Sequence, residues 1–176
     1  MIALAKPLYE GAVRAVRVFP DPLLKQKCDE VRDVNSSVMA VLDDLLKTML
    51  SLPRCVGLAA PQIGELVRIV VVDVSRHPKA PDKNHGLLCM INPMITHSMG
   101  SRVSREGCVS VPDLTANVSR SEQVAVSFID GNGAERSIEA HGFEAIAIQH
   151  ELDHLDGMLF LDRVTSKDLF KRKKSA

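Results

Sequence analysis

Apolar residues recur at intervals of three and four in two segments of the chain, and each segment predicts a helix. The first begins after the cap candidates at 35–37 and runs to about Leu52, just before Pro53. The second spans about 142–156, with Gly157 as its C-terminal cap. Apolar residues nearly encircle this second segment, which is typical of a helix that is buried on all sides.

Short β-branched or alternating segments lie between the two predicted helices and predict strands. The sequence Asp130-Gly131-Asn132-Gly133 is typical of a hairpin turn between two of these strands. Because the strands do not alternate with helices, the pattern indicates an α+β fold, in which antiparallel strands pack around the second helix. The predicted strands are 68–74, 87–92, 98–104, 123–129 and 134–140.

The remaining segments predict turns, loops and loosely held ends. We expect a turn at 20–22, a tight ordered loop at 56–64 and an exposed loop at 75–86. The lead-in 1–13 and the basic tail 167–176 are expected to be loosely ordered. No internal repeat is visible, so the whole chain, 1–176, is expected to form a single domain.

Composition narrows the class of protein. Hydrophobic residues make up 45% of the chain and charged residues 25%, which excludes disordered and collagen-like classes. Lys and Arg number 22, as do Asp and Glu, so the chain lacks the basic footprint of a DNA-binding protein. No apolar run is long enough for a membrane span, and residues 1–11 lack a secretory core. We therefore expect a soluble, cytoplasmic protein. The lead-in leaves a bacterial source and import into an organelle open, although it lacks the Arg and Ser content of a transit peptide.

The four cysteines are widely spaced and form no CxxC pair. In a reducing compartment each thiol is a small core residue, a metal ligand or a nucleophile. For any one of them, a buried core position is the first expectation. The cysteines are Cys28, Cys55, Cys89 and Cys108.

The strongest local signal is the HExxH sequence formed by His150, Glu151 and His154 on the second predicted helix. Residues four apart share one face of a helix, so both imidazoles can reach one metal ion. Glu151 follows the first histidine and is placed to act on a water held by that ion. Burying two histidines and a glutamate without partners is costly, and a metal ion removes part of this cost.

A catalytic site of this type needs a third protein ligand. The third histidine of a metzincin protease would fall at Phe160, so that interpretation fails, and no Glu follows Glu151. Asp156, Asp162 and Asp168 have simpler roles as caps or surface charges. Cys108 is the most attractive upstream candidate because it follows a glycine and ends a predicted strand.

Three motifs in this order resemble the peptide deformylase family. They are Gly57-Leu58-Ala59-Ala60-Pro61-Gln62, Glu106-Gly107-Cys108-Val109-Ser110 and Gln149-His150-Glu151-Leu152-Asp153-His154. The resemblance covers about 16–164 and includes the Pro-Asp-Pro-Leu-Leu at 20–24 and the pair Asn92-Pro93. It implies an enzyme that removes the formyl group from the N-terminal formyl-methionine of newly made proteins and releases formate.

The resemblance also implies a role for each site residue. Cys108, His150 and His154 would hold one divalent ion, commonly Fe²⁺, with Zn²⁺, Ni²⁺ or Co²⁺ able to occupy the site. Glu151 would be the catalytic acid and base, while the Gln62 amide and the Val109 N–H would bind the oxyanion. Further implied roles are main-chain hydrogen bonds to the peptide from Gly57 and Gly107, a methionine pocket formed by Val56, Phe143, Ile146 and Ala147, and a structural ion pair between Glu106 and Arg120.

The sequence departs from the usual family pattern at three positions. Cys55 replaces the first glycine of the first motif and puts a second thiol near the site. Val109 replaces a frequent Leu, which keeps the backbone N–H. Thr115 stands where many bacterial members have Arg, so one contact to the peptide backbone is not carried over.

Other interpretations stay open at this stage. A different HExxH metal amidase or peptidase would cleave intact peptide bonds, and a non-catalytic metal-binding module would not need Glu151. For the basic run 171–174, a solvated tail is the first expectation and a transient ribosome contact the alternative, since the family acts on nascent chains. The histidines outside the motif are expected mostly in surface loops; they are His77, His85, His97 and His141.

Overall fold

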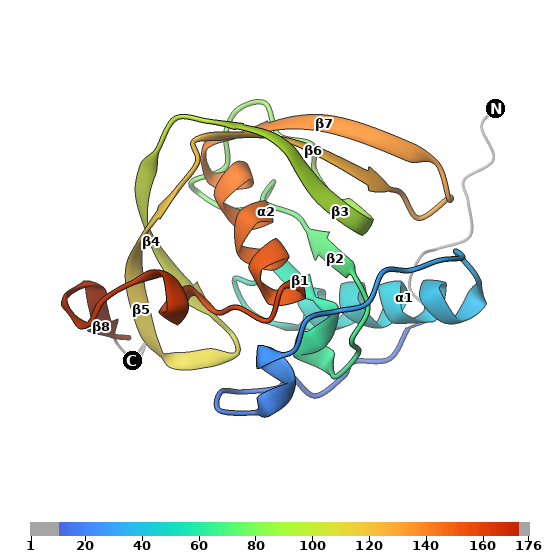
Figure 1. Ribbon diagram of the computed structural model, residues 1–176, viewed down its shortest axis with the longest axis horizontal. Coiled ribbons are helices and arrows are strands. Elements are labelled where there is room, and N and C mark those ends of the chain that lie inside the picture. Colours follow the sequence, from blue (N-terminus) through green and yellow to red (C-terminus); the bar gives the residue numbers. More distant parts are fainter. Residues whose placement is uncertain (1–10, 173–176) are drawn as a thin grey trace.

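Two antiparallel sheets and two helices make up the computed structural model, which describes residues 11–172. One sheet has the strand order β1-β2-β3-β6-β7 and the other the order β4-β5-β8. In Figure 1, α2 lies between the two sheets and α1 lies beside β1 and β2. The elements are α1 (Ser36–Ser51), β1 (Gly57–Ala59), β2 (Ile69–Val72), β3 (Leu88–Met99), β4 (Arg102–Cys108), β5 (Val111–Arg120), β6 (Gln123–Ile129), β7 (Glu135–His141), α2 (Gly142–Leu155) and β8 (Leu169–Lys171).

Both helices predicted from apolar spacing are present, and the predicted α+β class is confirmed. At the start of α1, the Asn35 side chain accepts hydrogen bonds from the backbone N–H groups of Ser37 and Val38, at 3.0 and 3.2 Å. After α2, Gly157 adopts φ +70°, the left-handed conformation that favours glycine. A Cβ at this position would also lie 2.7 Å from the carbonyl oxygen of Lys25. Among the described residues, no helix combines the length and apolar character that a membrane crossing needs.

Strand β2 connects the two main hydrophobic cores because both of its faces are buried. Ile69 and Val71 pack into the cluster that contains the buried face of α1. Val70 and Val72 point to the opposite face and pack against residues of α2. The continuous run of β-branched residues in this segment therefore reflects a strand covered by a helix on each side.

Several predicted strand boundaries were wrong. Residues 88–99 form one continuous strand through Pro93, which is tolerated because the pairing with β6 is irregular between Ile91 and Met94. The predicted strand at 98–104 is divided by Gly100, which takes φ +71° between β3 and β4. The loop predicted at 56–64 contains the short strand β1 and a 3₁₀ turn. The turn at 130–133 and the irregular segment at 75–86 were predicted correctly.

Strand β5 was missed, and the tail prediction was partly wrong. Alternate positions of β5 are buried, but they hold Ala116, Val118 and Arg120, so the hydrophobic signal is weak. Residues 169–171, expected to be loose, form β8 and pair with β5. The tail residues 173–176 and most of the lead-in, 1–10, lie outside the described residues. Within the lead-in, Ala12 N–H donates to Asp44 at 2.7 Å.

Candidate metal and active site

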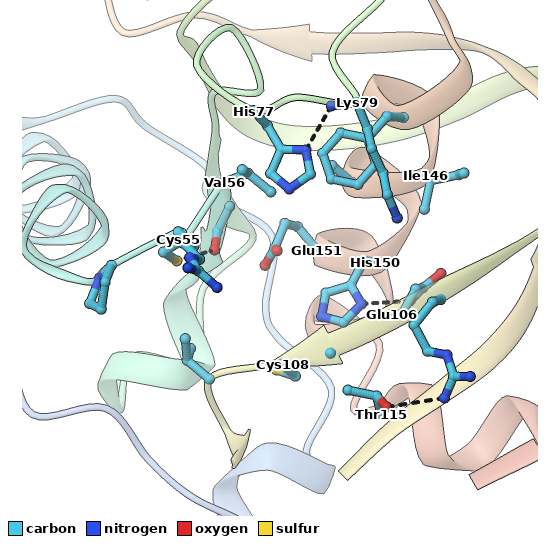
Figure 2. A pocket seen from close by; sticks show the side chains of 18 of the residues that line it. Cys55, Val56, His77, Lys79, Glu106, Cys108, Thr115, Ile146, His150 and Glu151 are labelled. Carbon is cyan, nitrogen blue, oxygen red and sulfur yellow. Dashed lines mark hydrogen bonds and ion pairs between the residues drawn. The ribbon is translucent and has the colours of Figure 1, made fainter. Parts of the chain in front are cut away.

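The HExxH residues lie on α2 opposite the end of β4, which carries Cys108. Ligand atoms of Cys108, His150 and His154 all lie within 4.8 Å of one another. The Cys108 Sγ is 3.3 Å from His154 Nε2, and both residues are buried. Figure 2 shows His150 and Glu151 side by side above Cys108. One helix and one strand end, far apart in the sequence, thus bring two imidazoles and a thiol to one point.

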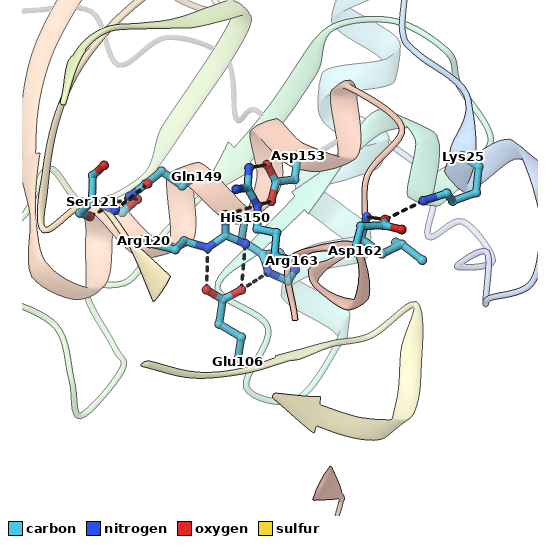
Figure 3. Close-up of polar contacts among 11 residues, drawn as sticks. Lys25, Glu106, Arg120, Ser121, Gln149, His150, Asp153, Asp162 and Arg163 are labelled. Atoms are coloured by element: carbon cyan, nitrogen blue, oxygen red, sulfur yellow. Dashed lines mark hydrogen bonds and ion pairs between the residues drawn. The ribbon is translucent and has the colours of Figure 1, made fainter. Parts of the chain in front are cut away.

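His150 is oriented by a buried ion-pair network behind it. Its Nδ1 lies 2.8 Å from Glu106 Oε2, so this nitrogen donates to the carboxylate and Nε2 is left for a ligand. Arg120 donates to both oxygens of Glu106 and, at 2.8 Å, to Asp153, as Figure 3 shows. Arg163 also binds Asp153. The predicted Glu106–Arg120 ion pair is confirmed, and the structure adds Asp153 and Arg163 to it.

The neighbours of Glu106 and Cys108 shift the pKa values of both groups. Burial alone would raise the pKa of Glu106, but hydrogen bonds from His150 and Arg120 outweigh it and lower this pKa to about 2. Burial also opposes ionisation of Cys108, yet the neighbouring His154 and His150 bring its pKa well below the ordinary value for a thiol. Glu106 is therefore a carboxylate at neutral pH, and the two histidines favour ionisation of the Cys108 thiol.

Glu151 is equally buried but lacks such partners. Its Oε2 has no hydrogen-bond partner among the described residues, and 5% of the residue is exposed. Burial raises the pKa of Glu151 to about 7. The side chain lies directly against β1: a Cβ at Gly57 would be 2.6 Å from Glu151 Oε1 and 2.8 Å from Cγ. Glycine at position 57 is therefore required for this close approach of strand and helix.

Gln62 is held rigidly beside the thiol. Its Oε1 accepts a hydrogen bond from Ala59 N–H at 2.9 Å, which fixes the orientation of the amide. Its Nε2 donates to Ser110 Oγ at 3.1 Å and lies 3.5 Å from Cys108 Sγ. Only 1% of Gln62 is exposed. The amide is thus a preorganised donor whose orientation is set by three neighbours.

A cavity of about 760 Å³ opens above these groups. All of the predicted site residues line it except His154, which is buried beside Cys108. Val56, Phe143, Ile146 and Ala147 form an apolar part of its wall, as the predicted methionine pocket requires. Cys55 also lines the cavity; burial raises its pKa to about 12, and its thiol donates to Gly57 O at 3.1 Å. It is a protonated thiol rather than a second thiolate.

Several residues at the cavity were missed by the sequence analysis. His77 stacks on Phe143 with ring centroids 4.3 Å apart and lines the cavity, although it was expected at the surface. Ser110 belongs to the second motif, and its hydroxyl could have been recognised as a polar partner for the site. Long cationic side chains from separate loops and strands also reach the cavity, and no local pattern marks them; they are Arg54, Lys79, Arg105 and Arg172.

The remaining cysteines and histidines lie away from the ligand atoms. All four cysteines are free; Cys28 and Cys89 contribute to the hydrophobic clusters. His97 was expected in a loop but pairs with Ala125 within the first sheet. His141 is the last residue of β7, and His85 donates its backbone N–H to Glu144 at 2.8 Å.

The fold and the site together define a class. An α+β protein that brings a thiol and two imidazoles to one point, beside a buried carboxylate whose Oε2 has no hydrogen-bond partner among the described residues, fits the class of metal-dependent hydrolases. Within this class, the sequence profile of the family described as polypeptide deformylase matches residues 13–170, and the chain belongs to this family. The enzyme removes the N-terminal formyl group from polypeptides. The match does not favour the alternatives of a peptidase or a non-catalytic module.

Relatives and solved structures agree over nearly the whole chain. A peptide deformylase from Thermodesulfovibrio yellowstonii is 41% identical over 92% of this chain and 96% of its own. One from Thermoanaerobacter pseudethanolicus is 42% identical over 86% and 89%. The crystal structure of peptide deformylase from Ehrlichia chaffeensis in complex with actinonin superposes with a TM-score of 0.82, at 34% identity and with 89% and 91% coverage.

Proposed function

We propose that the cavity above Cys108, His150 and His154 is the site of deformylation and that its residues have the roles implied by their motifs. The observation that carries this proposal is the buried Glu151 carboxylate, whose Oε2 has no partner among the described residues although it lies beside two histidines and a thiol. A structural carboxylate would be paired, as Glu106 is. A carboxylate left free at the floor of a cavity is available to a reacting water.

A divalent transition metal fits the donor set. Two imidazoles and a thiolate suit Fe²⁺, Zn²⁺, Co²⁺ or Ni²⁺ rather than Mg²⁺ or Ca²⁺, which prefer oxygen ligands. Glu106 accepts a hydrogen bond from His150 and so orients this imidazole, as carboxylates that contact histidine ligands do in metal sites. Cys108, His150 and His154 would hold the ion, with Fe²⁺ as the cellular metal. When bound, the ion supplies Lewis acidity toward the attacking water and the formyl oxygen.

Glu151 moves the proton that the reaction requires. Its carboxylate accepts a proton from the water as the water oxygen bonds to the formyl carbon. The same carboxyl group then delivers this proton to the amide nitrogen as the C–N bond breaks. Formate and a free α-amino group are the products. A pKa near 7 suits a group that must both accept and donate a proton at neutral pH.

Gln62 and the backbone N–H of Val109 stabilise the oxyanion that forms on the formyl oxygen. Because Ala59 and Ser110 already fix the Gln62 amide, little reorganisation is needed as charge develops. Gly57 and Gly107 donate and accept main-chain hydrogen bonds along the bound peptide. Val56, Phe143, Ile146 and Ala147 receive the methionine side chain, an unbranched thioether that adapts to an apolar wall. The partners are therefore formyl-methionyl peptides. A bacterial cytoplasmic location is supported by the bacterial relatives.

Formate release tests the proposal most directly. Protein purified anaerobically, with its metal content determined, is expected to release formate from formyl-Met-Ala without cleaving the Met-Ala bond. Formyl-Asp-Ala and formyl-Lys-Ala should react more slowly by several orders of magnitude in kcat/KM, because a charge would be desolvated in the apolar pocket. Equal rates for the charged analogues would contradict the pocket assignment, and cleavage of the peptide bond would contradict the reaction itself.

A further inference from the structure

The C-terminal strand carries an arginine into the active-site cavity. Strand β8 pairs with β5 through Leu114–Lys171, Thr115–Phe170 and Ala116–Leu169. The ladder continues beyond β8, since Arg172 N–H donates to Asp113 O at 2.9 Å. These backbone bonds fix the position of Arg172 relative to β5.

The guanidinium of Arg172 lies directly over the backbone that precedes the metal-site cysteine. Arg172 lines the cavity together with Gly107 and Thr115. A Cβ built at Gly107 would collide with Arg172 Nη2 and would lie 3.3 Å from Thr115 Cγ2. The absence of a side chain at Gly107 therefore makes room for the guanidinium beside Cys108.

This guanidinium has no partner of its own within residues 11–172. The neighbouring Arg105 differs: it donates to Thr115 Oγ1 at 3.3 Å and lies 3.5 Å from the centroid of the Phe170 ring. Arg172 makes no side-chain hydrogen bond or ion pair with any described residue. A planar group with five N–H donors, held at the wall of a substrate cavity and left free, is suited to bind an oxygen acceptor.

We propose that Arg172 is a substrate-binding residue, which donates hydrogen bonds to an oxygen of the peptide segment that follows formyl-methionine. This inference rests on the deformylase function proposed above. The acceptor is a backbone carbonyl or a side-chain carboxylate of that segment, since both present oxygen lone pairs to a guanidinium. The proposed methionine pocket, which includes Val56 and Ile146, lies on the opposite side of His150 from Thr115 (Figure 2). The basic C-terminal strand is thus part of the active site.

Lys171 provides the matched control. Side chains alternate along a strand, so Phe170 and Arg172 share one face of β8 and Lys171 lies on the other. Lys171 does not line the cavity and has the same charge as Arg172. Arg172→Ala and Lys171→Ala therefore change the net charge equally, and only the first removes a group from the cavity.

Three substrates separate binding of the downstream peptide from chemistry at the formyl group: formyl-Met amide, formyl-Met-Ala-Ser amide and formyl-Met-Ala-Glu amide. Arg172→Ala should lower kcat/KM for at least one of the tripeptides about tenfold, mainly through KM, which corresponds to one hydrogen bond to a charged donor. It should leave formyl-Met amide unchanged, and Lys171→Ala should behave as wild type on all three. Equal losses on both tripeptides identify a backbone carbonyl, whereas a loss confined to the Glu peptide identifies a carboxylate.

Two results would overturn the inference: equal behaviour of Arg172→Ala and Lys171→Ala, or an equal loss on formyl-Met amide, which would indicate a structural role. Calorimetry with the product Met-Ala-Ser amide and with Met-Ala-Glu amide measures peptide binding without the reaction. If wild-type protein released no formate from any substrate, the proposed function would fail. The calorimetric difference between wild type and Arg172→Ala would still decide the role of Arg172.

Discussion

Glu106 and Glu151 flank the same histidine, and their surroundings give them opposite properties (Figure 2). Both are at least 90% buried. Glu106 is bound by Arg120 and His150, and its pKa falls to about 2. Glu151 has one oxygen without a hydrogen-bond partner in residues 11–172, and its pKa rises to about 7. A buried carboxylate is thus structural where an arginine binds it directly, and chemically available where no described side chain donates a hydrogen bond to its buried oxygen.

Loss of the Cys108 thiol should have the largest effect, because it removes a proposed metal ligand. Cys108→Ser replaces the thiol ligand by a hydroxyl, which binds transition metals poorly. Changing a residue that only hydrogen-bonds to a metal ligand typically lowers metal affinity by about 10–100-fold, so loss of the ligand itself should lower it by more than about 100-fold. Metal content by elemental analysis and formate release both report the loss. Cys89→Ser is the control, because Cys89 is a half-buried thiol on β3 in a different cluster. Full metal content and activity in Cys108→Ser would place the third ligand elsewhere.

Glu151→Gln tests whether the carboxylate at the cavity takes part in the reaction. The variant keeps the shape of the side chain but cannot accept a proton, so kcat should fall by about 10²–10⁴ while the protein still folds and binds metal. Glu144→Gln is the matched control, since Glu144 is a buried glutamate on the same helix whose partner is His85. Its kcat should stay close to wild type. Near-normal turnover of Glu151→Gln would remove this residue from its assigned role.

Arg120→Met tests whether the ion pairs of Glu106 and Asp153 stabilise the fold. It leaves the carboxylates of Glu106 and Asp153 buried without their shared partner, so the free energy of unfolding should fall by about 3–5 kcal/mol. Urea denaturation measures this change. The control is Arg102→Met, which breaks an exposed pair with Glu122 and should cost less than about 1 kcal/mol. If both variants lost less than about 1 kcal/mol of unfolding free energy, the buried ion pairs would stabilise the fold no more than an exposed pair does.

Gln62→Leu should have the smallest of these effects, and it acts on rate alone. Loss of one oxyanion donor typically lowers kcat by about 10²–10³, with less change in KM because the ground-state formyl oxygen carries little charge. Metal content should be unchanged. A wild-type kcat, or a defect limited to metal loss, would refute the oxyanion role. Such a result would leave Glu151 as the main polar group that acts on the substrate.

Local spacing in the sequence was enough to predict both helices and the two candidate histidine ligands. Apolar intervals determine which face of a helix is buried, and a separation of four residues puts His150 and His154 on one face whatever surrounds them. The glycines at 57 and 64 predicted a tight ordered segment at 56–64, and Gly64 adopts φ +92°, the left-handed conformation that favours glycine. These features depend only on residues near one another in the chain.

Tertiary structure alone decided how the buried charges are divided and where the C-terminal strand lies. Glu151 and Asp153 are two residues apart on α2, but only Asp153 meets Arg120 and Arg163, which come from β5 and from a turn after the helix. Strand β8 exists because it pairs with β5, and its three residues carry too weak a pattern to predict it. Sequence patterns record which positions are buried, whereas the partner of a buried charge depends on segments that only folding brings together.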